Sequence, residues 1–92
     1  MKKNRDLLNE LGYENAIIFE NPDYDEAIIG VSHDDRVIYS FEKMVKCLVD
    51  NDKMTDEEAI EFIEYNTIRA IPYFGPSAPI VLMNEIMFSE NE

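Results

Sequence analysis

The chain has one histidine, His33, and two carboxylates, Asp34 and Asp35, follow it directly. A carboxylate beside an imidazole can tune it as a general acid or base. Catalysis would also need a nucleophile at a recognisable spacing, and the sequence contains none. We therefore predict that His33 is a turn residue between two strands and has no catalytic role.

Three acidic residues, Asp23, Asp25 and Glu26, form a compact turn that a hard cation could visit. An EF-hand loop would need further oxygen ligands, a central glycine and a terminal bidentate glutamate. The single cysteine, Cys47, has no histidine near it in the sequence, which argues against a reactive thiolate. We predict no catalytic residue, no metal ligand and no cofactor.

Negative charge dominates the chain, with 20 Asp and Glu against 8 Lys and Arg and a formal net charge of -12. In a helix that follows Thr55, three glutamates would form an acidic ridge and repel one another by a few tenths of a kcal/mol per pair. A ridge of this kind could imitate a nucleic-acid backbone inside a basic groove. It could also be a solvated face that maintains solubility. The residues of this acidic ridge are Glu57, Glu61 and Glu64.

The segment 65–76 is the least generic part of the chain, because it combines aromatic residues and turn formers with one cation. If they are exposed, Tyr73 and Phe74 together with Arg69 have the composition of an interface hot spot. The same rings could instead form the lid of the core. We name Arg69, Tyr73 and Phe74 as the candidate partner-binding residues.

The helices that would position these residues follow from apolar spacing. A short helix is predicted over residues 4–11, with three leucines on one stripe and Gly12 as its terminator. A second begins after the N-cap Ser40, where residues 41–49 repeat with the helical period. The leucines of the first stripe are Leu7, Leu8 and Leu11.

A third helix begins at Thr55, because Glu58 follows three residues later and completes a capping-box pattern. Its end is open. It could stop near Asn66 or run on until Pro72 blocks it.

Four segments rich in β-branched and aromatic residues read as strands, and turn residues separate the first three into an antiparallel meander. The segments are 16–19, 27–31, 36–39 and 80–83. The predicted fold class is α+β, with helices packed on one face of an antiparallel sheet of a three-stranded meander plus a C-terminal strand. The predicted order is α-β-β-β-α-α-β.

Length and composition predict one domain over residues 1–92, with an ordered core at about 4–83 and a loose acidic tail. No apolar stretch is long enough to span a membrane. One cysteine permits no internal disulfide and suits a reducing compartment, so we expect a cytoplasmic protein.

Three runs of the sequence, 15–19, 21–31 and 61–70 with 78–80, resemble small acidic proteins of unassigned function from gut-type Gram-positive bacteria and their mobile elements. The resemblance covers about residues 13–83. It implies a single cytoplasmic domain and favours a phage-related role. It carries no known activity, so it transfers no functional residue.

These observations predict a non-catalytic protein–protein interaction module whose partner is another protein. The alternative is a nucleic-acid mimic that inhibits a nucleic-acid-binding enzyme. The charge disfavours direct binding of nucleic acid, and no membrane partner is expected. An enzyme would need a concave pocket with converging polar groups near His33 or Arg69.

Overall fold

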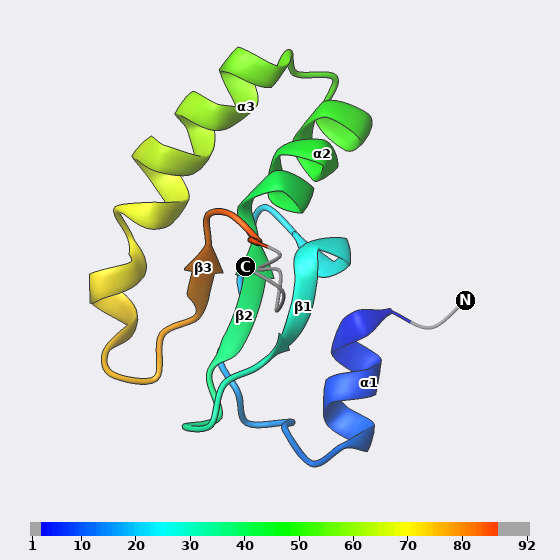
Figure 1. Ribbon diagram of the computed structural model, residues 1–92, viewed down its shortest axis with the longest axis vertical. Coiled ribbons are helices and arrows are strands. Elements are labelled where there is room, and N and C mark those ends of the chain that lie inside the picture. Colours follow the sequence, from blue (N-terminus) through cyan, green and yellow to red (C-terminus); the bar gives the residue numbers. More distant parts are fainter. Residues whose placement is uncertain (1–2, 87–92) are drawn as a thin grey trace, which may run out of the picture.

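The computed structural model describes residues 3–86, and its elements form an α+β fold, as the sequence predicts (Figure 1). The predicted loose tail at 89–92 lies outside the described residues. Along the chain the elements are α1 (Asn4–Glu10), the 3-10 turn η1 (Asp25–Ala27), β1 (Ile28–Val31), β2 (Val37–Ser40), α2 (Phe41–Asp52), α3 (Asp56–Phe62), the π-helix η2 (Ile63–Ile68), the 3-10 turn η3 (Ile71–Phe74) and β3 (Ile80–Leu82).

The sheet is mixed, so the prediction of a purely antiparallel sheet is wrong. Its order is β1-β2-β3, with β1 antiparallel and β3 parallel to β2. Figure 1 shows the reason: α2 leads away from one end of the sheet, and α3 with η2 and η3 returns the chain to the other end. A strand that enters after such a crossover runs parallel to the strand that preceded it.

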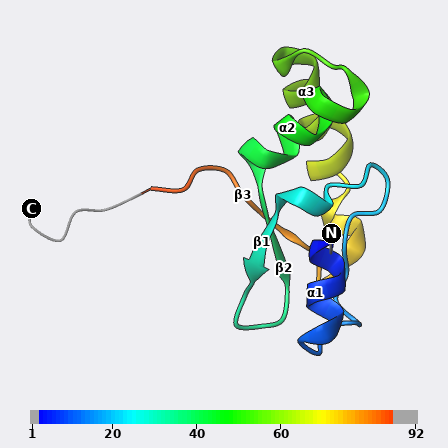
Figure 2. The same cartoon turned by 90° about the vertical axis from the view of Figure 1, so that its right-hand side faces the viewer.

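The first predicted strand, residues 16–19, is not a strand, and the order is therefore α-β-β-α-α-β. This segment runs along one side of the sheet (Figure 2). Phe19 is buried there, and its backbone N–H donates to the Tyr39 hydroxyl at 3.0 Å. Because a side chain satisfies this amide, the apolar run enters the core without joining the hydrogen-bond ladder.

The predicted helix starts are confirmed by their capping contacts. Ser40 accepts a hydrogen bond from the backbone N–H of Lys43 at 3.3 Å. At α3 the Thr55 hydroxyl accepts from the Glu58 N–H at 3.1 Å, and the Glu58 carboxylate accepts from the Thr55 N–H at 2.9 Å. Each contact satisfies a backbone donor that has no partner inside its helix.

The α-helical part of the third helix ends at Phe62, before either predicted end, and the helical backbone that follows passes Asn66 and stops at Ile68. Beyond Phe62 the backbone continues as the π-helix η2 and then forms η3, which takes up Pro72 in its first turn. The π-helical segment buries Ile63 and Thr67 and leaves Tyr65 exposed. It therefore sets which side chains of this segment face the core.

The helix α1 is held mainly by polar contacts. Leu7 and Leu11 are exposed and only Leu8 is buried, so the predicted inward leucine stripe is wrong for two of its three members. The Asp25 carboxylate instead accepts from the backbone N–H groups of Asn4 at 2.7 Å and Arg5 at 2.9 Å. This distant carboxylate satisfies donors at the start of α1, where a helix also favours negative charge.

The core gathers on one side of the central strand β2. Val37 and Tyr39 are fully buried, whereas Ile38 between them is only half-buried, as expected for side chains that alternate between two faces. Phe19 packs against Tyr39 with ring centroids 4.7 Å apart. The remaining fully buried large side chains include Tyr24, Met44, Leu48 and Ile63.

Candidate functional site

His33 lies in the β1–β2 turn, between two strands as predicted, and it is exposed. The Ser32 hydroxyl donates to the Asp34 carboxylate and lowers the pKa of Asp34. Arg36 donates from Nε to the Ala78 carbonyl at 2.7 Å and so ties this turn to the segment before β3. Each of these contacts stabilises the turn, and none of them orients the imidazole.

The acidic turn at residues 23–26 stabilises the start of α1. Asp23 and Asp25 both form ion pairs with Arg5. Within residues 3–86 no group of three His, Cys, Asp or Glu side chains is arranged to hold a metal ion.

Cys47 is buried, and burial raises the pKa of its thiol. A thiol with a raised pKa is a poor nucleophile at neutral pH.

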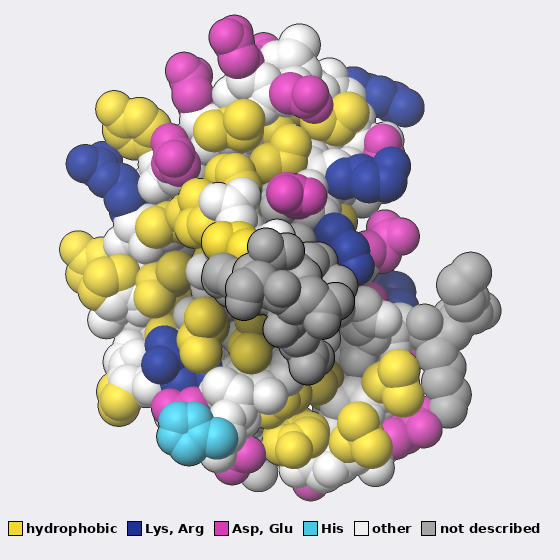
Figure 3. Space-filling view, in the orientation of Figure 1, with side chains coloured by type: hydrophobic (Ala, Val, Ile, Leu, Met, Phe, Trp, Pro, Cys, Tyr) yellow, Lys and Arg dark blue, Asp and Glu magenta, His cyan; other side chains and the backbone are white. Residues whose placement is uncertain are grey.

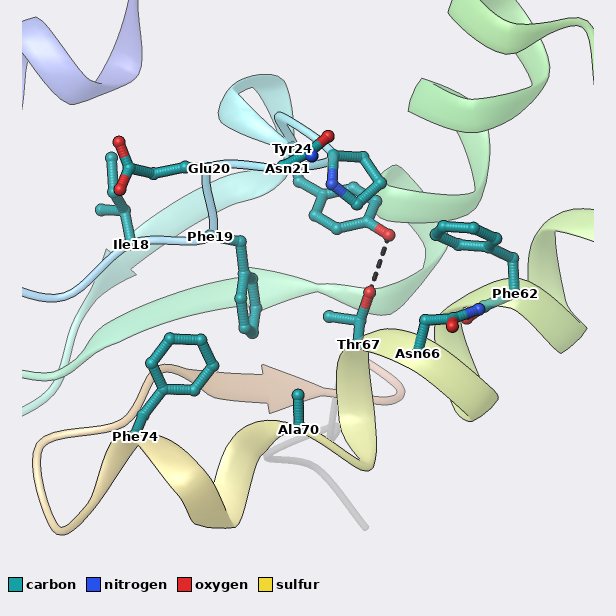
Figure 4. Close-up of a pocket in the computed structure, with 11 residues that line it drawn as sticks. Ile18, Phe19, Glu20, Asn21, Tyr24, Phe62, Asn66, Thr67, Ala70 and Phe74 are labelled. Carbon is teal, nitrogen blue, oxygen red and sulfur yellow. Dashed lines mark hydrogen bonds between the residues drawn. The ribbon is translucent and has the colours of Figure 1, made fainter.

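A cleft of about 420 Å³ opens between the segment before η1 and the helical stretch from α3 to η3 (Figure 4). We call it the aromatic cleft. Its residues come from parts of the chain that are distant in sequence: Ile18, Phe19, Glu20, Asn21, Pro22, Tyr24, Phe62, Asn66, Thr67, Ala70 and Phe74.

The floor of the aromatic cleft is closed by one buried polar pair. The Tyr24 hydroxyl lies 2.9 Å from the Thr67 hydroxyl, and both side chains are buried (Figure 4). Burial raises the pKa of Tyr24, so this hydroxyl is neutral at physiological pH. Among the described residues no buried side-chain nitrogen or oxygen lacks a hydrogen-bond partner. The two hydroxyls of the floor are therefore hydrogen-bonded to each other.

The rings beside this floor form a cluster of edge-on contacts that reaches the surface. Phe19 contacts Tyr24 edge-on at 6.0 Å and Phe74 at 5.9 Å between ring centroids. Phe74 is 38% exposed, so one part of its ring packs on the core and another faces solvent. Such edge-to-face contacts fix the rings in position.

We use the name aromatic patch for three aromatic side chains and one arginine that lie on η2, on η3 and between them: Tyr65, Arg69, Tyr73 and Phe74. Tyr73 is 92% exposed, which excludes a core lid made of both Tyr73 and Phe74. Tyr65 is 66% exposed. The Arg69 guanidinium lies 4.9 Å from the centroid of the Tyr65 ring. Figure 3 shows hydrophobic side chains with a cation among them on the side of η2 and η3. That the patch binds a partner stays a prediction.

The acidic ridge of Glu57, Glu61 and Glu64 is exposed along α3 and η2. Within residues 3–86 no cation forms an ion pair with any of the three. On the face shown in Figure 3, several acidic side chains lie at the end of the molecule formed by α2 and α3, with cations on one side of it. The ridge exists as a surface feature, and nucleic-acid mimicry by it stays a prediction.

The sequence does not predict the cleft. Its pattern places Phe19 in a strand, and Tyr24 and Thr67 are 43 positions apart, so no local pattern could pair them. One signal was available. Thr67 follows Ile63 by four residues, which puts a polar side chain on the inward face of the helix.

Comparisons of the chain with models of protein families, with curated proteins and with solved structures give no match. The resemblance to small acidic bacterial proteins thus stays a prediction, and function must be argued from the site. Every helix described in residues 3–86 is too short or too polar to cross a bilayer.

Proposed function

We propose that the protein is a non-catalytic interaction module that binds another protein through the aromatic patch. The observation that carries the proposal is the 92% exposure of the Tyr73 ring. A ring left in solvent contributes almost nothing to the core, whereas Tyr and Arg are the residues enriched in interface hot spots. The patch combines both types.

Local hydrogen bonds hold the patch in a defined geometry, which favours binding. The Tyr73 N–H donates to the Ala70 carbonyl at 3.0 Å, and the Gly75 N–H donates to the Pro72 carbonyl at 3.4 Å. Phe74 anchors the same turn on Phe19. Because these contacts position the backbone of the turn and the Phe74 ring, binding has less conformational entropy to remove there.

The chemistry of the neighbouring cleft supports a binding role over catalysis. Its buried hydroxyls, on Tyr24 and Thr67, satisfy each other and point to no open position for a reacting group. The buried, protonated thiol of Cys47 is compatible with a reducing, cytoplasmic environment. We place the protein there as part of the proposal.

A second candidate function is a nucleic-acid mimic, related to phages or mobile elements, that inhibits a nucleic-acid-binding enzyme. The observation in its favour is the exposure of all three glutamates of the acidic ridge without an ion pair in the described part of the chain. A basic groove would gain from such carboxylates as it does from phosphates.

Site-specific photo-cross-linking tests the proposal. Benzoylphenylalanine replaces Tyr73 in one variant and, as a control, Leu11 in another, because Leu11 is also exposed but lies outside the patch. Irradiation in cells should give a discrete adduct with another protein from position 73 and none from position 11. Equal adduct patterns from both positions would contradict the proposed site.

A further inference from the structure

We propose that the partner presents a basic segment with apolar anchor side chains, which occupies the aromatic cleft and a second cleft beside it. This inference rests on the proposed function and adds the chemical class of the partner. The inference rests on the shape of the clefts, on the apolar side chains that line them and on the sign of the charged lining residues.

The second cleft has a volume of about 400 Å³ and shares Asn21, Pro22 and Phe62 with the aromatic cleft. The two therefore adjoin, with Pro22 and Phe62 between them. We call them together the double cleft. The second cleft is completed by Asp23, Cys47, Leu48, Asn51, Asp52 and Met54.

The interior of the double cleft suits apolar side chains. The aromatic cleft is floored by the Phe19 ring and by the Tyr24 and Thr67 hydroxyls, which already satisfy each other. The second cleft has Leu48 and Met54 in its lining. An anchor that enters either cleft removes the apolar area of these side chains from water.

The charged residues that line the double cleft all carry the same sign. Among the residues of 3–86 its lining includes Glu20, Asp23 and Asp52 and no Lys, Arg or His. Asp23 is neutralised by Arg5, whereas Glu20 and Asp52 form no ion pair with the described cations. The carboxylates therefore attract a cationic segment and repel nucleic acid or a second copy of this acidic chain.

Binding of a synthetic peptide tests the inference. The probe is a short fluorescent peptide built from Leu and Lys, and its control has Glu in place of every Lys. By fluorescence anisotropy the Lys peptide should bind and the Glu peptide should bind at least about tenfold more weakly. Amide chemical-shift changes on binding should centre on Phe19, Thr67 and Phe74.

Charge-matched variants separate the double cleft from general attraction to an acidic protein. The double variant Glu20→Gln with Asp52→Asn should weaken the Lys peptide by about tenfold, because it removes the cleft carboxylates. The control, Glu14→Gln with Glu42→Gln, changes the net charge equally outside the double cleft and should leave binding within about twofold. All four side chains are exposed, so both variants are expected to fold.

Equal weakening by the two double variants, or shift changes away from the cleft residues, would overturn the inference. Concentration-dependent shifts of the cleft amides in the free protein would assign the double cleft to a second copy and overturn it as well. The outcomes of the two proposals are separable. A position-73 adduct with no peptide binding in the cleft keeps the proposed function and removes only this inference.

Discussion

Replacing Phe19 by alanine is expected to lower the free energy of unfolding by about 3–5 kcal/mol. The Phe19 ring is 6% exposed and contacts Tyr24, Tyr39 and Phe74. Its removal opens a cavity where the segment before η1 meets both the sheet and η3. For a domain with a total stability of about 5–15 kcal/mol, this loss is a large fraction. Urea unfolding followed by circular dichroism measures it.

Phe74→Ala provides the matched control, because it removes the same ring from a position that is 38% exposed. It should cost roughly 1–2 kcal/mol, since less apolar area returns to water. If the two variants were equally destabilised, Phe74 would be a core residue and the aromatic patch would lose one of its members.

Alkaline pH should destabilise the protein by about 2–3 kcal/mol through Tyr39 alone. Burial raises the pKa of Tyr39 from 10.0 to about 12, and the hydroxyl accepts the hydrogen bond from Phe19. The folded state therefore keeps this phenol neutral where the unfolded chain ionises it. The contribution of Tyr39 to stability is constant below pH 10, falls as the pH rises from 10 to 12, and then levels off.

Tyr39→Phe isolates this contribution. The variant should lose about 1–3 kcal/mol at neutral pH, because the Phe19 amide remains buried without a partner. Its stability should then fall less steeply between pH 10 and 12 than that of the wild type. Tyr24, whose pKa burial also raises, keeps part of the slope. Parallel pH profiles for the two proteins would show that Tyr39 is not held neutral by the fold.

The features that could be predicted from the sequence are those whose partners lie close in the chain. The capping box of Thr55 and Glu58 spans three residues, and the Ser40 cap also reaches three residues ahead. Backbone geometry at a helix start depends on such near neighbours. Both predictions are confirmed.

The features that could not be predicted depend on distant neighbours. The apolar run 16–19 has the composition of a strand. The backbone N–H of Phe19, however, donates to the hydroxyl of a β2 side chain and not to a neighbouring strand. Composition alone therefore assigns this run wrongly. The parallel direction of β3 results from the path of the whole α2 to η3 crossover. Leu7 and Leu11 have helical spacing, yet nothing in the described structure packs against them closely enough to bury them.

The residues of the candidate site can be predicted from composition, but whether their side chains are exposed can be seen only in the structure. The composition of the segment predicts Arg69, Tyr73 and Phe74 as binding residues, because aromatic and arginine side chains are common in interfaces. The same rings would suit a core lid, and burial depends on whether an element elsewhere in the chain covers them. The structure exposes Tyr73 and places Phe74 at the boundary.

The affinity of the cross-linked partner for matched variants is the most direct test of the claim that the aromatic patch is the binding site. We predict that Tyr73→Ala raises the dissociation constant about 30-fold or more, equivalent to about 2 kcal/mol, without changing stability. Neutralising the acidic ridge should change it only a few-fold at moderate salt. If Tyr73→Ala kept wild-type affinity while the triple variant Glu57→Gln, Glu61→Gln and Glu64→Gln lost binding, the aromatic patch would not be the binding site. That result would favour the nucleic-acid mimic.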